Sequence, residues 1–386
     1  MTARDTGEQH RASTPLELLF DLTFVVAVGR VAAELAHSIA TDDLSHGLGA
    51  YLMVFFAIWW AWVNFTWFAS AYDTDDVGYR LLTLLQMAGV LVLAASVATA
   101  FEHDNFTGLV IGYVIMRVAM VAQWLRAAAQ DREHRQTALR YAGGVFAIQV
   151  CWVLRLLLPD RIALVSFLIL AALDMAVPAW AERTSTTSWH PRHIAERYGL
   201  FTLIVLGECV LAASNALQDA NAAHSSVAPL VVLGTGALVL LFALWWLYYL
   251  RDPAEGLGSQ RNAVSFRWGY GHYGVFASLA AVGAGLEVAA EAVSEQIEAS
   301  DLTVAYAVAV PICIFIFLLW FLHKPLNDQP CPSLPQVLVT IVAILLIAAF
   351  GSALPLAGVV AALCLPPAGL VAVSVRALHR SEPASD

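Results

Sequence analysis

The chain has 386 residues, of which 60% are hydrophobic and 13% are charged, and its mean hydropathy is +0.70. Soluble domains carry roughly a quarter charged residues, so this composition excludes a water-soluble globular fold. Twenty Lys+Arg stand against 30 Asp+Glu, which gives a formal net charge of −10. With no basic tract in the chain, nucleic acid is excluded as a partner.

The cysteines do not predict a disulfide-bonded domain, and the N-terminal segment does not predict a cleaved signal peptide. The five cysteines are scattered singly and never spaced as CxxC: Cys151, Cys209, Cys313, Cys331 and Cys364. They predict no disulfide framework and no metal site, and no other pattern in the chain predicts a cofactor. Residues 1–13 lack an apolar core, so we expect the first hydrophobic run to be a resident membrane helix.

Hydrophobic windows of membrane-spanning length divide the chain into twelve predicted helices. A bilayer core about 30 Å thick requires about 20 mostly apolar residues per helix. Pro311 and the pair Pro366–Pro367 fall within these windows and predict interrupted helices, although a lone proline more often only kinks one. The windows are residues 15–37, 48–71, 79–101, 106–126, 139–158, 162–180, 191–217, 227–250, 268–293, 302–322, 335–353 and 356–375.

The distribution of basic residues predicts that both termini are cytoplasmic. Loops that remain in the cytoplasm keep positive charge, and with the N-terminus inside only Arg155 and Arg161 fall on the outer side, whose loops are acidic. Sixteen basic residues then lie on the inner side: Arg4, Arg11, Arg80, Arg126, Arg132, Arg135, Arg140, Arg183, Arg192, Arg197, Arg251, Arg261, Arg267, Lys324, Arg376 and Arg380. We therefore predict a multi-pass protein of the bacterial inner membrane.

Two similar halves are predicted from a weak internal repeat. The segment from Glu17 can be aligned with the segment from Glu196, matching Thr23 with Thr202, and tryptophan-rich runs follow in each half. Six spans per half keep both halves in one orientation, as in the parallel repeats of some transporters. The predicted organisation is a cytoplasmic segment 1–14, a first six-helix half 15–180, a linker 181–190, a second half 191–375 and a cytoplasmic tail 376–386.

Charged residues inside the first span are functional candidates, because charge within hydrocarbon is costly and usually marks a pathway or a paired site. Glu17 and Asp21 lie four residues apart and therefore on one helix face. Thr14, Pro15 and Glu17 also form a capping box, so Glu17 has a structural explanation as well as a proton- or substrate-binding one. Asp21 lacks such an explanation, and function is favoured over a buried structural hydrogen bond.

The seventh span adds Glu196 and Arg197 at its inner end and Glu208 near its middle. A carboxylate at mid-bilayer must be protonated, paired or bound to a cation. Glu208 is the strongest single candidate, with a helix-to-helix hydrogen bond as its alternative. His193 lies on the same face as Arg197, but His190 and His193 together are more typical of a helix start near lipid headgroups than of metal ligands.

Two further charges lie in the fourth and sixth spans, at Arg117 and Asp174. Arginine keeps its proton in proteins, so Arg117 must pair with a carboxylate, and Asp21, Asp174 and Glu208 are the candidates. The buried charges show a negative surplus, which suits protonation or a bound cation more than a free anion.

The opening Thr14-Pro-Leu-Glu-Leu-Leu-Phe-Asp-Leu-Thr-Phe-Val25 resembles the bacterial low temperature requirement protein A family. The run from Glu196 to Glu208 resembles the second signature of that family, and the resemblance extends over nearly the whole chain. It implies a polytopic inner-membrane protein without an established substrate or reaction. Matching positions place the family pattern on Glu17, Asp21, Glu196, Arg197, Gly207 and Glu208.

These observations predict an all-α transporter of a small polar or cationic solute, with or without coupled protons. Asp21 and Glu208 would titrate or bind the cation, Arg117 would be their charge partner, and Glu17 and Glu196 would act as inner-gate or capping residues. The alternatives are a membrane-embedded enzyme acting on lipid, with His190, His193 and Glu196 at the inner interface, and a non-catalytic sensor or scaffold. The expected partners are the lipid bilayer and a small solute or ion, and the sequence does not specify an oligomeric state.

Overall fold

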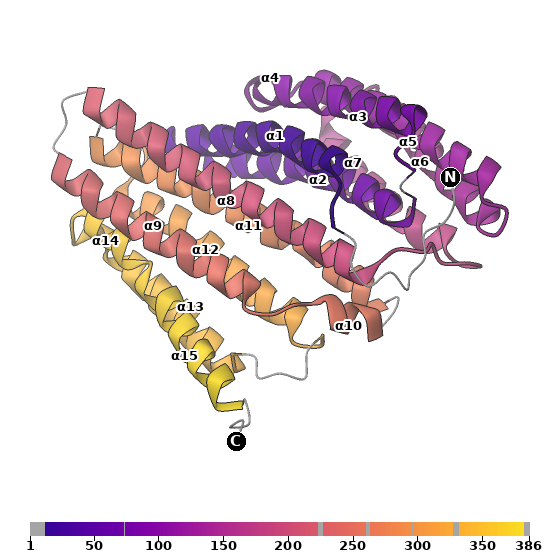
Figure 1. Ribbon diagram of the computed structural model, residues 1–386. Helices are drawn as coiled ribbons and strands as arrows, with labels where there is room; N and C mark the ends of the chain where they lie inside the picture. Colours follow the sequence, from indigo (N-terminus) through magenta and orange to yellow (C-terminus); the bar gives the residue numbers. More distant parts are fainter. Residues whose placement is uncertain are drawn as a thin grey trace. The chain divides into compact units, whose positions relative to one another are not determined.

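The structure, a computed structural model, describes residues 12–72, 74–222, 227–259, 263–294, 297–326 and 332–381. Every regular element within those ranges is helical (Figure 1). The α-helices are α1 (Pro15–Ala40), α2 (Leu44–Ala71), α3 (Val77–Ala95), α4 (Val97–His103), α5 (Thr107–Gln130), α6 (Arg135–Arg155), α7 (Ala163–Ala181), α8 (Pro191–Ala222), α9 (Val227–Tyr249), α10 (Ala254–Ser259), α11 (Ala263–Ser294), α12 (Asp301–His323), α13 (Leu334–Ala349), α14 (Leu356–Ala362) and α15 (Leu365–Ser381). Two short 3₁₀ helices, η1 (Asp160–Ile162) and η2 (Phe350–Ser352), lie between them.

Most of the longer helices have the length and apolar composition needed to cross a membrane. Across the described part of the chain, ten helical segments are long and apolar enough to cross a bilayer, judged by length and composition. Helices α1 and α8 are not among the ten, although their 26 and 32 residues exceed the roughly 20 that a bilayer requires. The all-helical, multispanning class is thus confirmed, whereas twelve crossings and cytoplasmic termini stay predictions.

The chain divides into two compact units that do not follow chain order strictly. The first comprises Met1–Val31 and Met53–Arg197, and the second comprises Ala32–Leu52 and Tyr198–Asp386. Helices α1, α2 and α8 therefore each contribute residues to both units. The predicted halves, their linker at 181–190 and the internal repeat stay predictions.

In the first unit α3 packs on α5, α5 on α6, and α6 on α7 (Figure 1, purple helices). The α3–α5 crossing depends on two glycines that face each other. A Cβ atom at Gly89 would lie 2.7 Å from the carbonyl oxygen of Gly112, and one at Gly112 would lie 2.6 Å from that of Gly89. Small residues let helix backbones approach closely in membranes, where packing drives association.

We expect Gly89→Ala to lower the free energy of unfolding by about 1–3 kcal/mol, the range for overpacked sites. The added methyl group would meet the backbone of α5, which cannot rotate away as a flexible side chain can. Gly143→Ala on α6 is the matched control, because a Cβ there meets nothing within 4 Å. Thermal unfolding in detergent checks the prediction, and equal midpoints for the two variants would contradict it.

In the second unit α11 packs on α12, α12 on α13, and α9 on both α14 and α15. Helix α12 is continuous through Pro311, so the predicted interruption there is wrong. The Ala307 carbonyl, which has no N–H partner at a proline, faces Gly285 of α11, where a Cβ would lie 2.7 Å from it. The interruption at Pro366–Pro367 is confirmed: α14 and α15 are separate helices, and the prolines lie in the first turn of α15, where the missing N–H costs little.

Candidate functional site

Helix α1 begins with the predicted capping box. The Thr14 backbone N–H donates to Glu17 Oε2 at 2.8 Å, and the Glu17 backbone N–H donates to Thr14 Oγ1 at 3.2 Å. Both bonds satisfy amides that the first helical turn would otherwise leave without partners. The structural explanation for Glu17 is therefore confirmed, and it uses only one of the two carboxylate oxygens.

The other oxygen of Glu17 enters a cluster of buried charges at the start of α8. Glu17 Oε1 lies 3.0 Å from His193 Nε2 and 3.0 Å from Arg197 Nη1. Arg197 Nη2 donates to Asp21 Oδ1, which also accepts a hydrogen bond of 2.8 Å from Trp62 Nε1 of α2. We call Glu17, Asp21, His193 and Arg197 the charged cluster.

The geometry of the charged cluster follows from matched spacings on two helices. Glu17 and Asp21 are four residues apart on α1, as are His193 and Arg197 on α8, so each pair lies on one helix face. The contacts advance in the same direction along both helices, from Glu17–His193 to Asp21–Arg197. The two segments therefore run parallel where they meet.

The charged cluster is sealed from solvent and its charges are not equal in number. Glu17 and Asp21 are each 1% exposed, and His193 and Arg197 are fully buried. Two carboxylates face one guanidinium, which cannot lose its proton. With a neutral His193 the group carries one net negative charge, and one added proton brings it to zero.

A second buried ion pair lies within the first unit, away from the charged cluster in sequence. Arg117 Nη2 of α5 lies 3.2 Å from Asp174 Oδ2 of α7 and donates to the hydroxyl oxygen of Tyr113 at 2.8 Å. Trp152 Nε1 of α6 donates to Asp174 Oδ2 at 3.3 Å. Arg117 and Asp174 are 4% and 2% exposed, so both charges are desolvated and rely on each other.

These two groups correct one expectation about charge partners. Of the three carboxylates expected as partners of Arg117, Asp174 is the one that it contacts. The expected role of Arg117 as charge partner of Asp21 is wrong, because Asp21 pairs with Arg197. Helix faces can be assigned within one sequence segment, but the choice among several carboxylates depends on which helices become neighbours. The contacts α5–α6 and α6–α7 bring Arg117 and Asp174 together.

The remaining candidates lie outside the charged cluster. Glu196 is exposed and accepts a hydrogen bond of 3.1 Å from the Ser13 backbone N–H. Glu208 belongs to the second unit and is half-buried, and no hydrogen bond or ion pair joins it to a described side chain. The roles predicted for Glu196 and Glu208 in binding stay predictions.

Sequence reasoning missed two members of the site. We placed His193 near the lipid headgroups, whereas it is fully buried against Glu17, and we treated Trp62 only as part of a tryptophan-rich run. The pair His193 and Arg197 repeats the spacing of Glu17 and Asp21 with basic side chains in place of acidic ones, and this complementarity is the signal that could have identified the cluster.

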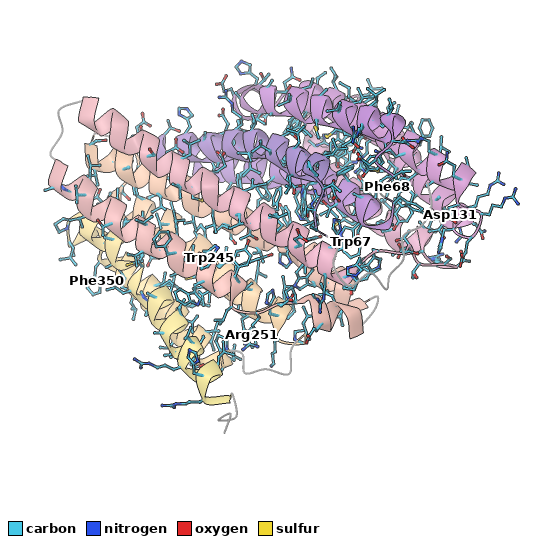
Figure 2. All side chains as sticks on the ribbon, viewed as in Figure 1. Trp67, Phe68, Asp131, Trp245, Arg251 and Phe350 are labelled. Atoms are coloured by element: carbon cyan, nitrogen blue, oxygen red, sulfur yellow. The ribbon has the colours of Figure 1, made fainter. Side chains whose placement is uncertain are left out.

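Asp131, labelled in Figure 2, lies at the connection between α5 and α6 and accepts several hydrogen bonds there. The Tyr72 hydroxyl donates to Asp131 Oδ2 at 2.9 Å, and the backbone N–H groups of Glu133 and His134 donate to Asp131 Oδ1. Burial tends to raise the pKa of Asp131, but the hydrogen bonds from His134 and Tyr72 outweigh it and hold the pKa below its ordinary value. Asp131 thus stays ionised as a structural anchor.

Among the residues that the structure describes, no group of three or more His, Cys, Asp or Glu side chains is arranged to hold a metal ion. The charged cluster contains an arginine at its centre, and a guanidinium occupies the position that a cation would take between the two carboxylates.

Multiple apolar helices and deeply buried charge pairs define a polytopic helical membrane protein. The chain belongs to the bacterial low temperature requirement A (LtrA) protein family, whose model matches residues 12–375. It is also similar to a protein of Rhizobium meliloti (strain 1021) that is described as uncharacterized, with 26% identity over 285 residues, 70% of this chain and 67% of the relative. The family match covers both the capping box and the charged cluster.

Proposed function

We propose that the protein is a transporter of the bacterial inner membrane that moves a small polar or cationic solute, coupled to protons through the charged cluster. In this proposal all twelve predicted spans cross the membrane, as two parallel six-helix halves with cytoplasmic termini. Helices α1 and α8, which carry the cluster, are then the first spans of the two halves. Their parallel course at the cluster supports this arrangement.

The contact of His193 with Glu17, away from solvent, is the observation that carries the proposal. Ionisable groups inside a membrane protein are costly and often mark proton relays or ion pathways. Within the four residues of the cluster, the net charge changes by one when His193 gains or loses a proton. A site whose net charge changes by one on protonation is the element that a proton-coupled carrier requires.

The Glu17–His193 contact is where this proton resides in the proposal. Arg197 forms ion pairs with both carboxylates, and His193 lies against Glu17. Protonation of His193 adds an ion pair between His193 and Glu17, and loss of that proton removes it. Movement of α1 against α8 would then follow the charge state, because these contacts join the two helices.

Reconstituted vesicles with an internal pH-sensitive dye provide the test. Wild-type protein is offered a panel of alkali cations, ammonium and zwitterionic amino acids, and solute-dependent proton flux is recorded. Glu17→Gln is expected to reduce the flux at least tenfold. The glutamine keeps the size of the side chain and removes the charge that the proton balances. Glu102→Gln is the matched control, because Glu102 is exposed and lies outside the charged cluster.

Glu208→Gln extends the same assay to the second sequence candidate. It is expected to abolish flux as well, while the protein stays folded in the membrane, if Glu208 lies on the path of the solute. Wild-type flux in folded Glu17→Gln protein would refute the role of the charged cluster, and wild-type flux in Glu208→Gln would remove Glu208 from the path.

A further inference from the structure

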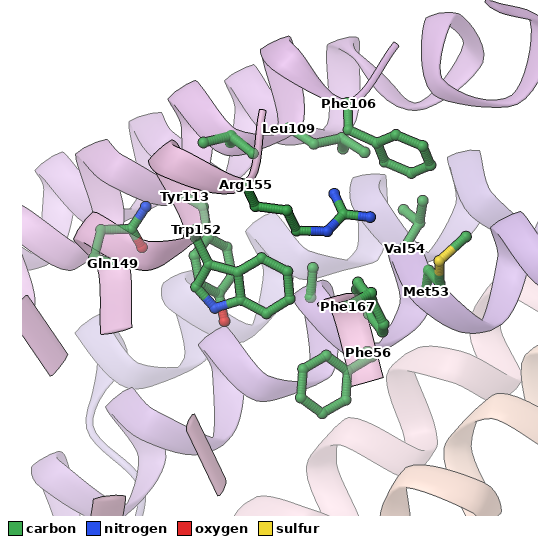
Figure 3. Close-up of a pocket in the computed structure, with 12 residues that line it drawn as sticks. Met53, Val54, Phe56, Phe106, Leu109, Tyr113, Gln149, Trp152, Arg155 and Phe167 are labelled. Carbon is green, nitrogen blue, oxygen red and sulfur yellow. The ribbon is translucent and has the colours of Figure 1, made fainter. Parts of the chain in front are cut away.

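A pocket in the first unit is lined by aromatic rings and one arginine (Figure 3). Its walls come from α2, α5, α6 and α7, and the empty space within and at its mouth amounts to about 520 Å³. Five rings face this space: Phe56, Phe106, Tyr113, Trp152 and Phe167. Ligand sites are typically apolar clefts with a few convergent polar groups, and none of these residues belongs to the charged cluster.

Among the described side chains, the arginine of the pocket has no acidic partner. The Arg155 guanidinium donates from Nη2 to the Ala163 carbonyl at 2.9 Å, and no ion pair links it to a carboxylate of the described side chains. Its carbon Cζ lies 5.9 Å from the ring centroid of Phe106, 5.9 Å from that of Trp152 and 5.8 Å from that of Phe167. The charge of Arg155 is therefore permanent, held among rings, and available to an anion.

Gln149 gives the pocket a second polar group. Its side chain is 8% exposed, and neither its Oε1 nor its Nε2 finds a hydrogen-bond partner among the described residues. A buried amide without partners is costly, and native structures contain few of them. Both Gln149 and Arg155 line the pocket, and Figure 3 shows the guanidinium beside Phe106 and Phe167, with Gln149 on the side of Tyr113 and Trp152.

Helix α6 sets the spacing between these two polar groups. Gln149, Trp152 and Arg155 follow one another at intervals of three residues, so they form a stripe along one side of the helix. Six residues correspond to about 9 Å along the helix axis. The stripe thus offers a donor–acceptor amide, an indole face and a cation in succession.

We propose that this pocket binds an anionic amphiphile whose apolar, aromatic-sized body lies among the rings, with its carboxylate or phosphate on Arg155 and a neutral polar group on Gln149. The same anionic chemistry can come from a free amphipathic acid or from the headgroup of a membrane lipid. The pocket is distinct from the charged cluster that carries the proposed transport. The binding proposal therefore does not depend on whether the charged cluster moves protons.

The test measures binding of 6-hydroxy-2-naphthoate and 2-naphthoate to the full-length protein in nanodiscs of uncharged phosphatidylcholine, by titration calorimetry. Arg155→Met is expected to weaken the binding of both acids by about tenfold or more, the typical effect of losing a hydrogen bond to a charged group. Arg161→Met is the matched control, because Arg161 is exposed and does not line the pocket. Naphthalen-2-ylmethylammonium, which reverses the charge, should not bind.

Gln149→Leu provides a second variant that does not depend on Arg155. Replacing an amide without partners by an apolar side chain of similar size should keep or raise the thermal midpoint and abolish the preference for the hydroxylated acid. Nanodiscs containing phosphatidylglycerol identify the source: competition with the naphthoates indicates a lipid headgroup, and its absence indicates a free acid. Absence of saturable binding to wild type, or equal affinity in Arg155→Met, would overturn the proposal.

Discussion

Replacing Arg197 with methionine is expected to lower the free energy of unfolding by about 3–5 kcal/mol, the range for a buried charge group that loses one partner. Arg197 forms ion pairs with both Glu17 and Asp21, and all three side chains are at most 1% exposed. Without the guanidinium, two carboxylates would share a site from which water is excluded. The measurement is thermal or denaturant unfolding of the purified protein in one detergent.

Two further variants separate the loss of charge from the loss of side-chain volume. Arg192→Met changes an exposed arginine on the same helix, so its midpoint should match that of wild type. Adding Asp21→Asn to Arg197→Met removes the carboxylate that has lost its arginine and keeps the hydrogen bond from Trp62, and should restore part of the stability. A destabilisation that Asp21→Asn leaves unchanged would show that packing, and not charge, explains the role of Arg197.

Arg117→Met is expected to destabilise the first unit by a similar amount, about 3–5 kcal/mol, but the double replacement should behave differently. Asp174 would keep only the hydrogen bond from Trp152 in the single variant. Changing the whole pair, Arg117→Met with Asp174→Leu, leaves no charge stranded, and such replacements are often neutral or stabilising. Recovery of the midpoint in the double variant, measured by thermal unfolding, would identify the pair as structural.

The control for this pair is Arg140→Met, which removes an arginine of α6 whose Nη1 donates to Thr184 Oγ1 near the surface. A shift of less than about 1 kcal/mol is expected, as for other exposed polar contacts. If the double variant is as unstable as Arg117→Met alone, the pair has a packing role that methionine and leucine cannot replace.

The positions of the long helices could be predicted from hydropathy, but the local breaks within them could not. Each of the twelve predicted windows overlaps one or two helices in the structure, because long apolar runs must satisfy their backbone groups internally. The windows missed the division of the third span into α3 and α4 at Ser96, whose hydroxyl donates to the Val92 carbonyl. They also missed α10, a six-residue helix in the connection after α9. Averages over 20 residues cannot resolve such local hydrogen bonding.

The sequence identified several residues of the candidate site, but it did not identify which residues from other helices they contact. The capping box needs only four consecutive residues, and it is confirmed. The partners of Asp21 are Arg197, which lies 176 positions away, and Trp62, which lies 41 positions away. Contacts of this kind depend on how helices are arranged in space, which spacing within one helix does not specify.

The double role of Glu17 has a practical consequence for handling the protein. One oxygen of its carboxylate fixes the first turn of α1 and the other holds His193 and Arg197. Tension applied to the chain just before Thr14, by a purification tag or a fused reporter, would reach the buried acids through a single side chain. Engineered attachments at that end should therefore be separated from Thr14 by a long flexible spacer.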